Sequence, residues 1–120
     1  MELGTSLEEY LETIYILEII KGKKVRNVDL VETLNVKKPS VSRAVKKLEN
    51  EGYITKGLNY ELILTEKGKD LGGRIYQRYV FWRRLLKKAG VDKESAEVEA
   101  LDMRHVLTDK SFRKLKKIYK

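Results

Sequence analysis

Apolar residues recur at intervals of three and four along most of this chain, which is the spacing of one face of an α-helix. The first such stripe runs from Leu7 to Leu17 and predicts a helix over residues 6–20, which Gly22 ends. The last part of this segment is apolar on more than one side, so we expect that part to be buried more completely than the start.

The next two stripes are short and close together. Asn27 can cap a second helix, which ends at a turn at Asn35, and Pro39 suits the first turn of a third helix that Gly52 ends. Two short helices joined by a tight turn form a helix-turn-helix. The positions of the third helix that we expect to be buried are Val41, Ala44, Val45 and Leu48.

Two strand-like segments follow, over residues 53–56 and 60–64, around a Gly-Leu-Asn turn. A hairpin in this place, after a helix-turn-helix, is called a wing. Thr65 then caps a long helix that reaches about Lys88 and passes through the Gly72-Gly73 pair.

The remainder predicts two more helices, from about residue 93 to 107 and from 109 to the end. The fold class is therefore mostly α with a small β-hairpin wing: a winged helix-turn-helix domain over residues 1–70 and a helical dimerisation domain over residues 71–120. This second domain has more apolar side chains than three short helices can bury, so we expect a homodimer. The interface candidates are Phe81, Trp82, Leu85, Val98, Leu101 and Phe112.

Charge is arranged in blocks. Lys and Arg outnumber Asp and Glu by 26 to 18, for a net charge of +8. Residues 21–88 have 18 basic and 7 acidic residues, whereas residues 1–20 have five acidic residues and no basic one. A basic body favours a polyanionic partner such as DNA.

Composition also excludes several classes of protein. The chain has no cysteine, so disulfides and thiolate metal sites are excluded, and with one histidine and no phosphate-binding Gly-rich loop we expect no enzyme. No apolar run is long enough to span a membrane and no signal peptide precedes the first helix, so we expect a soluble, cytoplasmic protein without membrane contact.

The outward face of the third helix suits the major groove of DNA. Arg43 can pair two donors with a guanine edge, while Ser and Lys side chains bind phosphate oxygens and Pro39 can touch a thymine methyl group. Two rival functions are a divalent-metal nuclease and a winged helix that binds protein or RNA. The residues that we expect to contact DNA are Lys37, Lys38, Pro39, Ser40, Ser42, Arg43, Lys46, Lys47 and the wing residue Lys56.

Five segments, taken in order, resemble the diphtheria toxin repressor and manganese transport regulator family. They are SLEEYLETIY (6–15), VDL (28–30), PSVS (39–42), LTEKG (64–68) and HVLT (105–108). The resemblance implies a homodimeric repressor of operator DNA with manganese or ferrous iron as co-repressor. The chain ends where the shorter, manganese-type members end.

The ligand positions of that family are only partly retained. Glu9 and Glu12 match ligands of the first helix and His105 matches a ligand of the fifth. Three other ligand positions have changed. This chain has Tyr79 where a histidine is expected, Leu101 where a glutamate or cysteine is expected, and Arg104 where a glutamate is expected. A further site of the longer members maps to Tyr79, Arg83 and Glu97, of which only Glu97 readily binds metal.

Two accounts of these changes stay open. In the first, Glu9, Glu12 and His105 bind Mn²⁺ or Fe²⁺ together with Glu99 or Asp102, which precede His105 on the predicted fifth helix. In the second, the guanidinium of Arg104 pairs with Glu9 or Glu12 and permanently supplies the charge that a metal ion supplies elsewhere.

Overall fold

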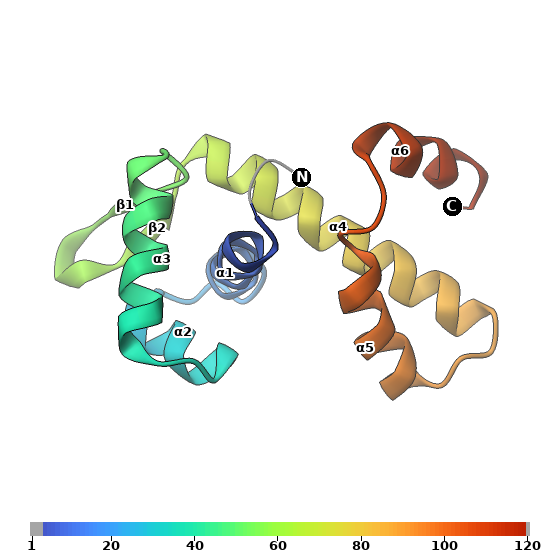
Figure 1. Cartoon of the computed structure of the whole chain (residues 1–120), viewed down its shortest axis with the longest axis horizontal. Helices are drawn as coiled ribbons and strands as arrows, with labels where there is room; N and C mark the ends of the chain where they lie inside the picture. The colour runs from blue at the N-terminus through green and yellow to red at the C-terminus, as the bar shows by residue number, and fades with distance from the viewer. Residues whose placement is uncertain (1–3, 120) are drawn as a thin grey trace. The chain divides into compact units, whose positions relative to one another are not determined.

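The computed structural model describes residues 4–119 and is mostly helical with a two-stranded hairpin (Figure 1). The chain divides into two compact units, one that runs to Gly73 and one that begins at Arg74. The elements in order are α1 (Thr5–Tyr15), η1 (Ile16–Ile20), α2 (Asn27–Leu34), α3 (Lys38–Asn50), β1 (Ile54–Lys56), η2 (Leu58–Tyr60), β2 (Leu62–Leu64), α4 (Glu66–Lys88), α5 (Lys93–Met103) and α6 (Asp109–Ile118).

The N-terminal unit has an apolar core contributed by α1, α2, α3 and the hairpin. The buried stripe that the sequence predicts for α3 is confirmed, since all four of its side chains are buried. Leu11 and Ile14 of α1 and Leu30 of α2 are fully buried in the same unit. The α3 helix is therefore held by one face, and its other face is left for solvent or a partner.

The ends of the first two helices differ from the predictions in detail. The first helical segment changes at Ile16 into a wider π-helical turn before Gly22, whose φ of +65° suits glycine. The cap of α2 is Arg26 rather than Asn27, because the backbone N–H of Arg26 donates to the Asp29 carboxylate at 2.8 Å. Asn35 does end α2 in the left-handed conformation, as expected of that turn.

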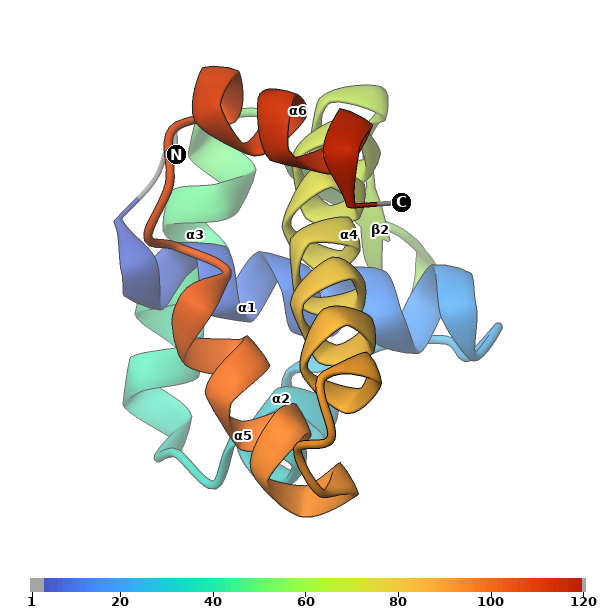
Figure 2. The same cartoon turned by 90° about the vertical axis from the view of Figure 1, so that its right-hand side faces the viewer.

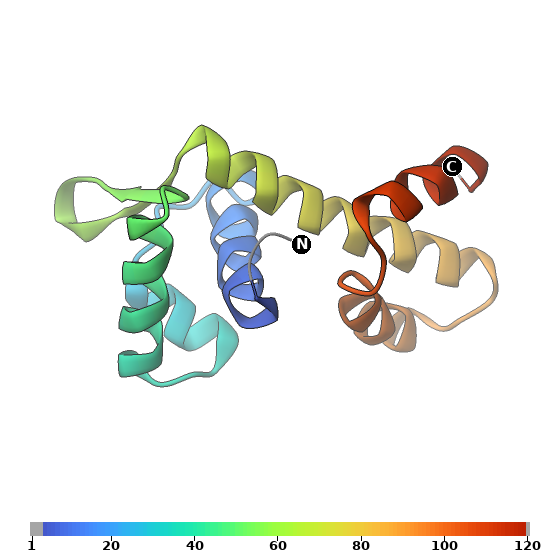
Figure 3. The same cartoon turned by 45° about the horizontal axis from the view of Figure 1, so that its top comes forward.

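The hairpin is shorter than predicted because a helical turn over η2 takes up its tip. Ile54 pairs with Leu64 in an antiparallel register, and Asn59 and Tyr60 have φ values of 58° and 62°, which exclude Tyr60 from the strand. The start of β2, next to the tip, is fixed by the N–H of Leu62, which donates to Val25 O at 2.7 Å. The hairpin projects beyond α3 (Figure 3).

Two glycines of α4 allow close packing within the N-terminal unit. Thr65 caps the helix as predicted, with its hydroxyl accepting the N–H of Gly68 at 3.1 Å. A Cβ atom at Gly68 would lie 2.0 Å from the carbonyl oxygen of Tyr53, and one at Gly72 would lie 3.0 Å from Cβ of Tyr15. Close approach of neighbouring elements therefore outweighs the helix-weakening effect of these glycines.

In the C-terminal unit, α5 and α6 lie on different sides of α4 (Figure 2). The rings of Phe81 on α4 and Phe112 on α6 pack edge to face with centroids 5.1 Å apart. The fifth helix ends at Met103 rather than near residue 107, and residues 104–106 form a turn. His105 consequently follows the helix instead of lying on it.

Candidate nucleic-acid interface and metal-ligand positions

The face of α3 opposite its buried stripe is exposed and basic. Ser42, Arg43, Lys46 and Lys47 are exposed, and Ser40 is half-buried beside them. The Arg43 guanidinium lies 3.5 Å from Ser40 Oγ, at the outer limit of a hydrogen bond. One helix thus presents donors for base edges and cations for phosphates on the same side.

The start of α3 adds positive charge to this face. Lys37, Lys38 and Pro39 are exposed there, with Lys37 as the cap residue and Pro39 in the first turn. A helix N-terminus carries a partial positive charge, so phosphate oxygens are favoured at this end.

A cleft beside the wing includes a cation that the sequence reasoning missed. Arg26, Asn27, Val28, Lys56 and Tyr60 line a hollow of about 310 Å³ between the start of α2 and the hairpin. Lys56 was expected to contact phosphate, and Arg26 now lies close to it. The only signal in the sequence was a basic residue directly before a short helix, and such a residue by itself does not indicate a contact with DNA.

The predicted metal ligands are distributed unevenly within their elements. In the N-terminal unit Glu9 is exposed, while Glu12 is buried with 3% of its surface accessible. In the C-terminal unit Glu99 and Asp102 are exposed on α5, and His105 is half-buried in the turn after it. The spacing argument that placed these three on one helix is wrong, because α5 ends before His105.

Neither unit by itself brings the predicted donors together in the part of the chain that the structure describes. Across residues 4–119, no three His, Asp or Glu side chains cluster in a way that could hold a metal ion. Arg104 occupies the same turn as His105 and is buried, with 4% of its surface accessible. Its guanidinium donates to the carbonyl oxygen of Leu101, which anchors it at the end of α5.

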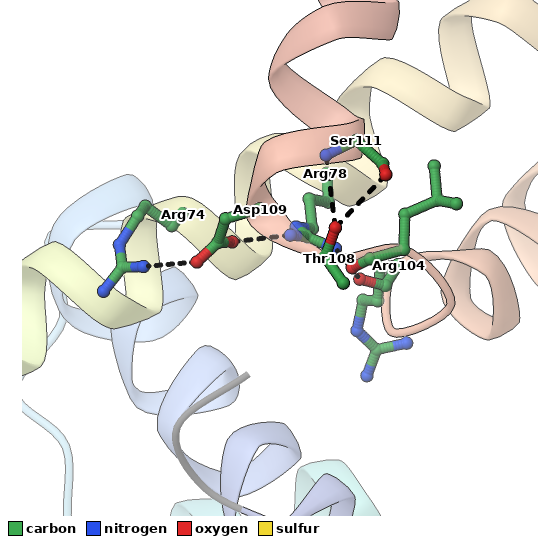
Figure 4. Close-up of polar contacts among 7 residues, drawn as sticks. Arg74, Arg78, Arg104, Thr108, Asp109 and Ser111 are labelled. Carbon is green, nitrogen blue, oxygen red and sulfur yellow. Dashed lines mark hydrogen bonds and ion pairs between the residues drawn. The ribbon is translucent and has the colours of Figure 1, made fainter.

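Arg78 is a second buried cation, and its interactions organise the C-terminal unit (Figure 4). It is 2% exposed and donates to Asp109 Oδ1 at 2.6 Å, to Leu107 O at 2.5 Å and to Arg104 O at 3.4 Å. Arg74 reaches the other oxygen of Asp109 at 3.3 Å. One side chain of α4 thereby joins the end of α5, the following turn and the start of α6.

Sequence reasoning missed both Arg78 and the buried Glu8, which is 1% exposed. A signal was available for Arg78. It continues the spacing of Leu71 and Ile75 along α4, and a cation on an apolar stripe requires an internal partner.

The residues predicted to form the dimer interface differ in their burial within one protomer. Phe81 and Phe112 are buried against each other inside one protomer. Trp82 packs edge to face on Phe81, and Leu85 is half-buried. Val98 and Leu101, three residues apart on α5, are 61% and 42% exposed, so these two remain accessible to a partner.

Comparison with protein families identifies both units. Residues 2–57 match the N-terminal DNA-binding domain of iron-dependent repressors, and residues 65–120 match the metal-binding and dimerisation domain of the same proteins. This chain belongs to the iron-dependent repressor family. Members of this family are transcriptional regulators rather than enzymes, and the predicted presence of an N-terminal DNA-binding domain is confirmed.

Relatives of the iron-dependent repressor family include the regulator MntR of Lysinibacillus sphaericus, which is 36% identical over 86% of this chain and 73% of its own length. An uncharacterized regulator of Methanocaldococcus jannaschii is 31% identical over 95% of this chain and 92% of its own. Among solved structures, the manganese regulator SloR superimposes with a TM-score of 0.75 at 28% identity, and the chain spans about half of its length (52%). No helix among the described residues is long and apolar enough to cross a membrane.

The Arg78–Asp109 pair gives a testable expectation for the stability of this protein. Asp109→Asn should lower the free energy of unfolding by about 1–3 kcal/mol, below the roughly 3–5 kcal/mol of a fully buried pair, because the Asp109 side chain is 44% exposed. Urea unfolding followed by fluorescence of Trp82, the sole tryptophan, measures this loss. The exposed neighbour Lys110→Ala is the control, and equal stability of both variants would contradict the assigned role.

Proposed function

We propose that this protein is a homodimeric transcriptional regulator, acting as a repressor, that binds double-stranded operator DNA through the outward face of α3. The observation that carries the proposal is the division of α3 into a buried apolar stripe and an exposed face with Arg43, Lys46 and Lys47. The family match supports DNA as the partner and argues against the nuclease and protein-binding alternatives.

In this proposal the contacts on α3 have different tasks. Arg43 reads a guanine edge with two donors. Lys46, Lys47 and the cations at the start of α3 bind phosphates and set the register of the helix in the groove. Lys56 and Arg26 extend the phosphate contacts to the wing side.

Removing these two kinds of contact should have different consequences. Arg43→Ala should weaken binding to the preferred duplex by about 1–3 kcal/mol and relax the choice of base, because a bidentate contact is lost. Lys47→Ala should weaken all duplexes about equally and reduce the salt dependence, because a phosphate contact is lost. Selection from a random duplex pool followed by fluorescence anisotropy at two salt concentrations measures both. If Arg43→Ala changed no base preference, α3 would not be the reading element.

The homodimer is proposed to form through the exposed apolar side of α5. Val98 and Leu101 belong to a matched dimerisation domain and lie outside the apolar core of their own unit. Phe81 and Phe112 stabilise the protomer instead, which revises the interface that the sequence predicts.

A pair of matched substitutions tests this interface. Val98→Glu should shift the protein to monomers, because it places a charge in an apolar contact, while Ile118→Glu at a comparably exposed site on α6 (73%) should leave the dimer intact. Sedimentation equilibrium of both variants and the parent protein measures whether each is a monomer or a dimer. Dissociation of Ile118→Glu with Val98→Glu still dimeric would assign the interface to α6.

For regulation we propose that Arg104 takes the place of the metal ion. The proposal rests on the sequence, which has a cation, Arg104, at a position where the family resemblance implies a glutamate ligand. We propose that Arg104 pairs with Glu12 or Glu9 of α1. This supplies a fixed positive charge where relatives hold an ion, and DNA binding then needs no co-repressor.

The metal question has a direct experiment. Manganese, ferrous iron and chelators should leave the operator affinity of the parent protein unchanged, whereas Arg104→Glu should bind DNA weakly until manganese is added. Anisotropy titrations measure affinity, and circular dichroism checks that the variant folds. Stoichiometric manganese binding by the parent, with a rise in operator affinity, would instead support the rearranged site of Glu9, Glu12 and His105 with Glu99 or Asp102.

A further inference from the structure

A cavity in the C-terminal unit is lined by none of the residues that we propose for DNA contact or metal binding. It has a volume of about 250 Å³ and is bordered by α4 and α6. Four of its side chains are cationic, namely Arg74, Arg78, Arg113 and Lys116, and one is acidic, Asp109. The lining therefore carries a formal excess of three positive charges.

This excess already includes the charge of Asp109, whose two oxygens are both engaged by the inner arginines. Oδ1 of Asp109 accepts from Arg78 at 2.6 Å, and Oδ2 accepts from Arg74 at 3.3 Å (Figure 4). Arg78 is further fixed by the carbonyl oxygens of Leu107 and Arg104. The inner wall is thus rigid and positive, while Arg113 and Lys116 on α6 are exposed at the rim.

The remaining lining indicates what kind of anion fits. Phe112 forms an apolar wall, held by an edge-to-face contact with Phe81 and by the Arg78 guanidinium 4.9 Å from its ring centre. Gln77 adds a neutral amide. The volume is slightly below the roughly 300–1,000 Å³ of drug-sized ligand sites, so the ligand has a small organic part.

We infer that this cavity binds a small phosphate monoester. A phosphate monoester brings up to two negative charges and three acceptor oxygens, which match several cations better than a single carboxylate does. Its organic part lies against Phe112, and its phosphate group lies at the rim between Arg113 and Lys116. A phosphate of the DNA backbone has the same chemistry but no small apolar group to fill the cavity.

The experiment uses phenyl phosphate as the probe and isothermal titration calorimetry as the readout. The parent protein should bind one molecule per chain. Replacing Arg113 and Lys116 together by alanine should reduce the affinity at least about tenfold, the effect of losing one charge-assisted hydrogen bond. Gln77→Glu, which adds a negative charge to the lining with little change of shape, should reduce it as well.

The matched control removes the same charge from the same helix. Lys114→Ala with Lys117→Ala leaves the cavity lining unchanged, so phenyl phosphate should bind within about twofold of the parent. Equal loss in both double variants would show diffuse attraction to a basic helix and overturn the proposal, as would the absence of saturable binding. Displacement of the probe by a non-specific duplex, with the same dependence on Arg113 and Lys116, would assign the site to DNA and also overturn it.

Discussion

Arg78 places a full positive charge on the apolar side of α4, and the arrangement of the C-terminal unit follows from compensating that charge. Transfer of an unpaired cation into a protein interior costs several kcal/mol, so a buried guanidinium needs an anion and hydrogen-bond acceptors close to it. Asp109 at the start of α6 and the carbonyl oxygens of Leu107 and Arg104 meet this requirement. The position of α6 and the turn after α5 are therefore determined largely by one guanidinium, with the Phe81–Phe112 contact adding apolar burial beside it.

The N-terminal unit could be predicted from the sequence in most respects. The stripe of α3, the turn at Asn35 and the cap at Thr65 are local features, and each depends on side chains only a few residues apart. The position of the hairpin was predicted correctly, but its strands were predicted to be longer than they are. Its tip is set by left-handed backbone at Asn59 and Tyr60, and tyrosine gives no sign of that conformation in a sequence.

The C-terminal unit was harder to predict for a physical reason. The end of α5 at Met103 is marked by no glycine or proline, and residues 104–106 turn where Arg104 and Arg78 find backbone carbonyls as partners. Such long-range hydrogen bonds are invisible to periodicity. The same holds for the aromatic residues, because helical spacing cannot tell whether Phe81 meets Phe112 of its own chain or a partner protomer.

Under our proposal that Arg104 takes the place of the metal ion, the changed ligand positions are a substitution of charge rather than a simple loss. A metal ion and a guanidinium can both neutralise buried carboxylates, but only the metal ion exchanges with the surrounding solution. An ion leaves when its concentration falls, so it reports on the cell, whereas Arg104 is covalently part of the chain. On that proposal the chain keeps the electrostatic stabilisation and gives up metal sensing. A response to the cell would then need another ligand, and the positive cavity between α4 and α6 has the charge and volume for one.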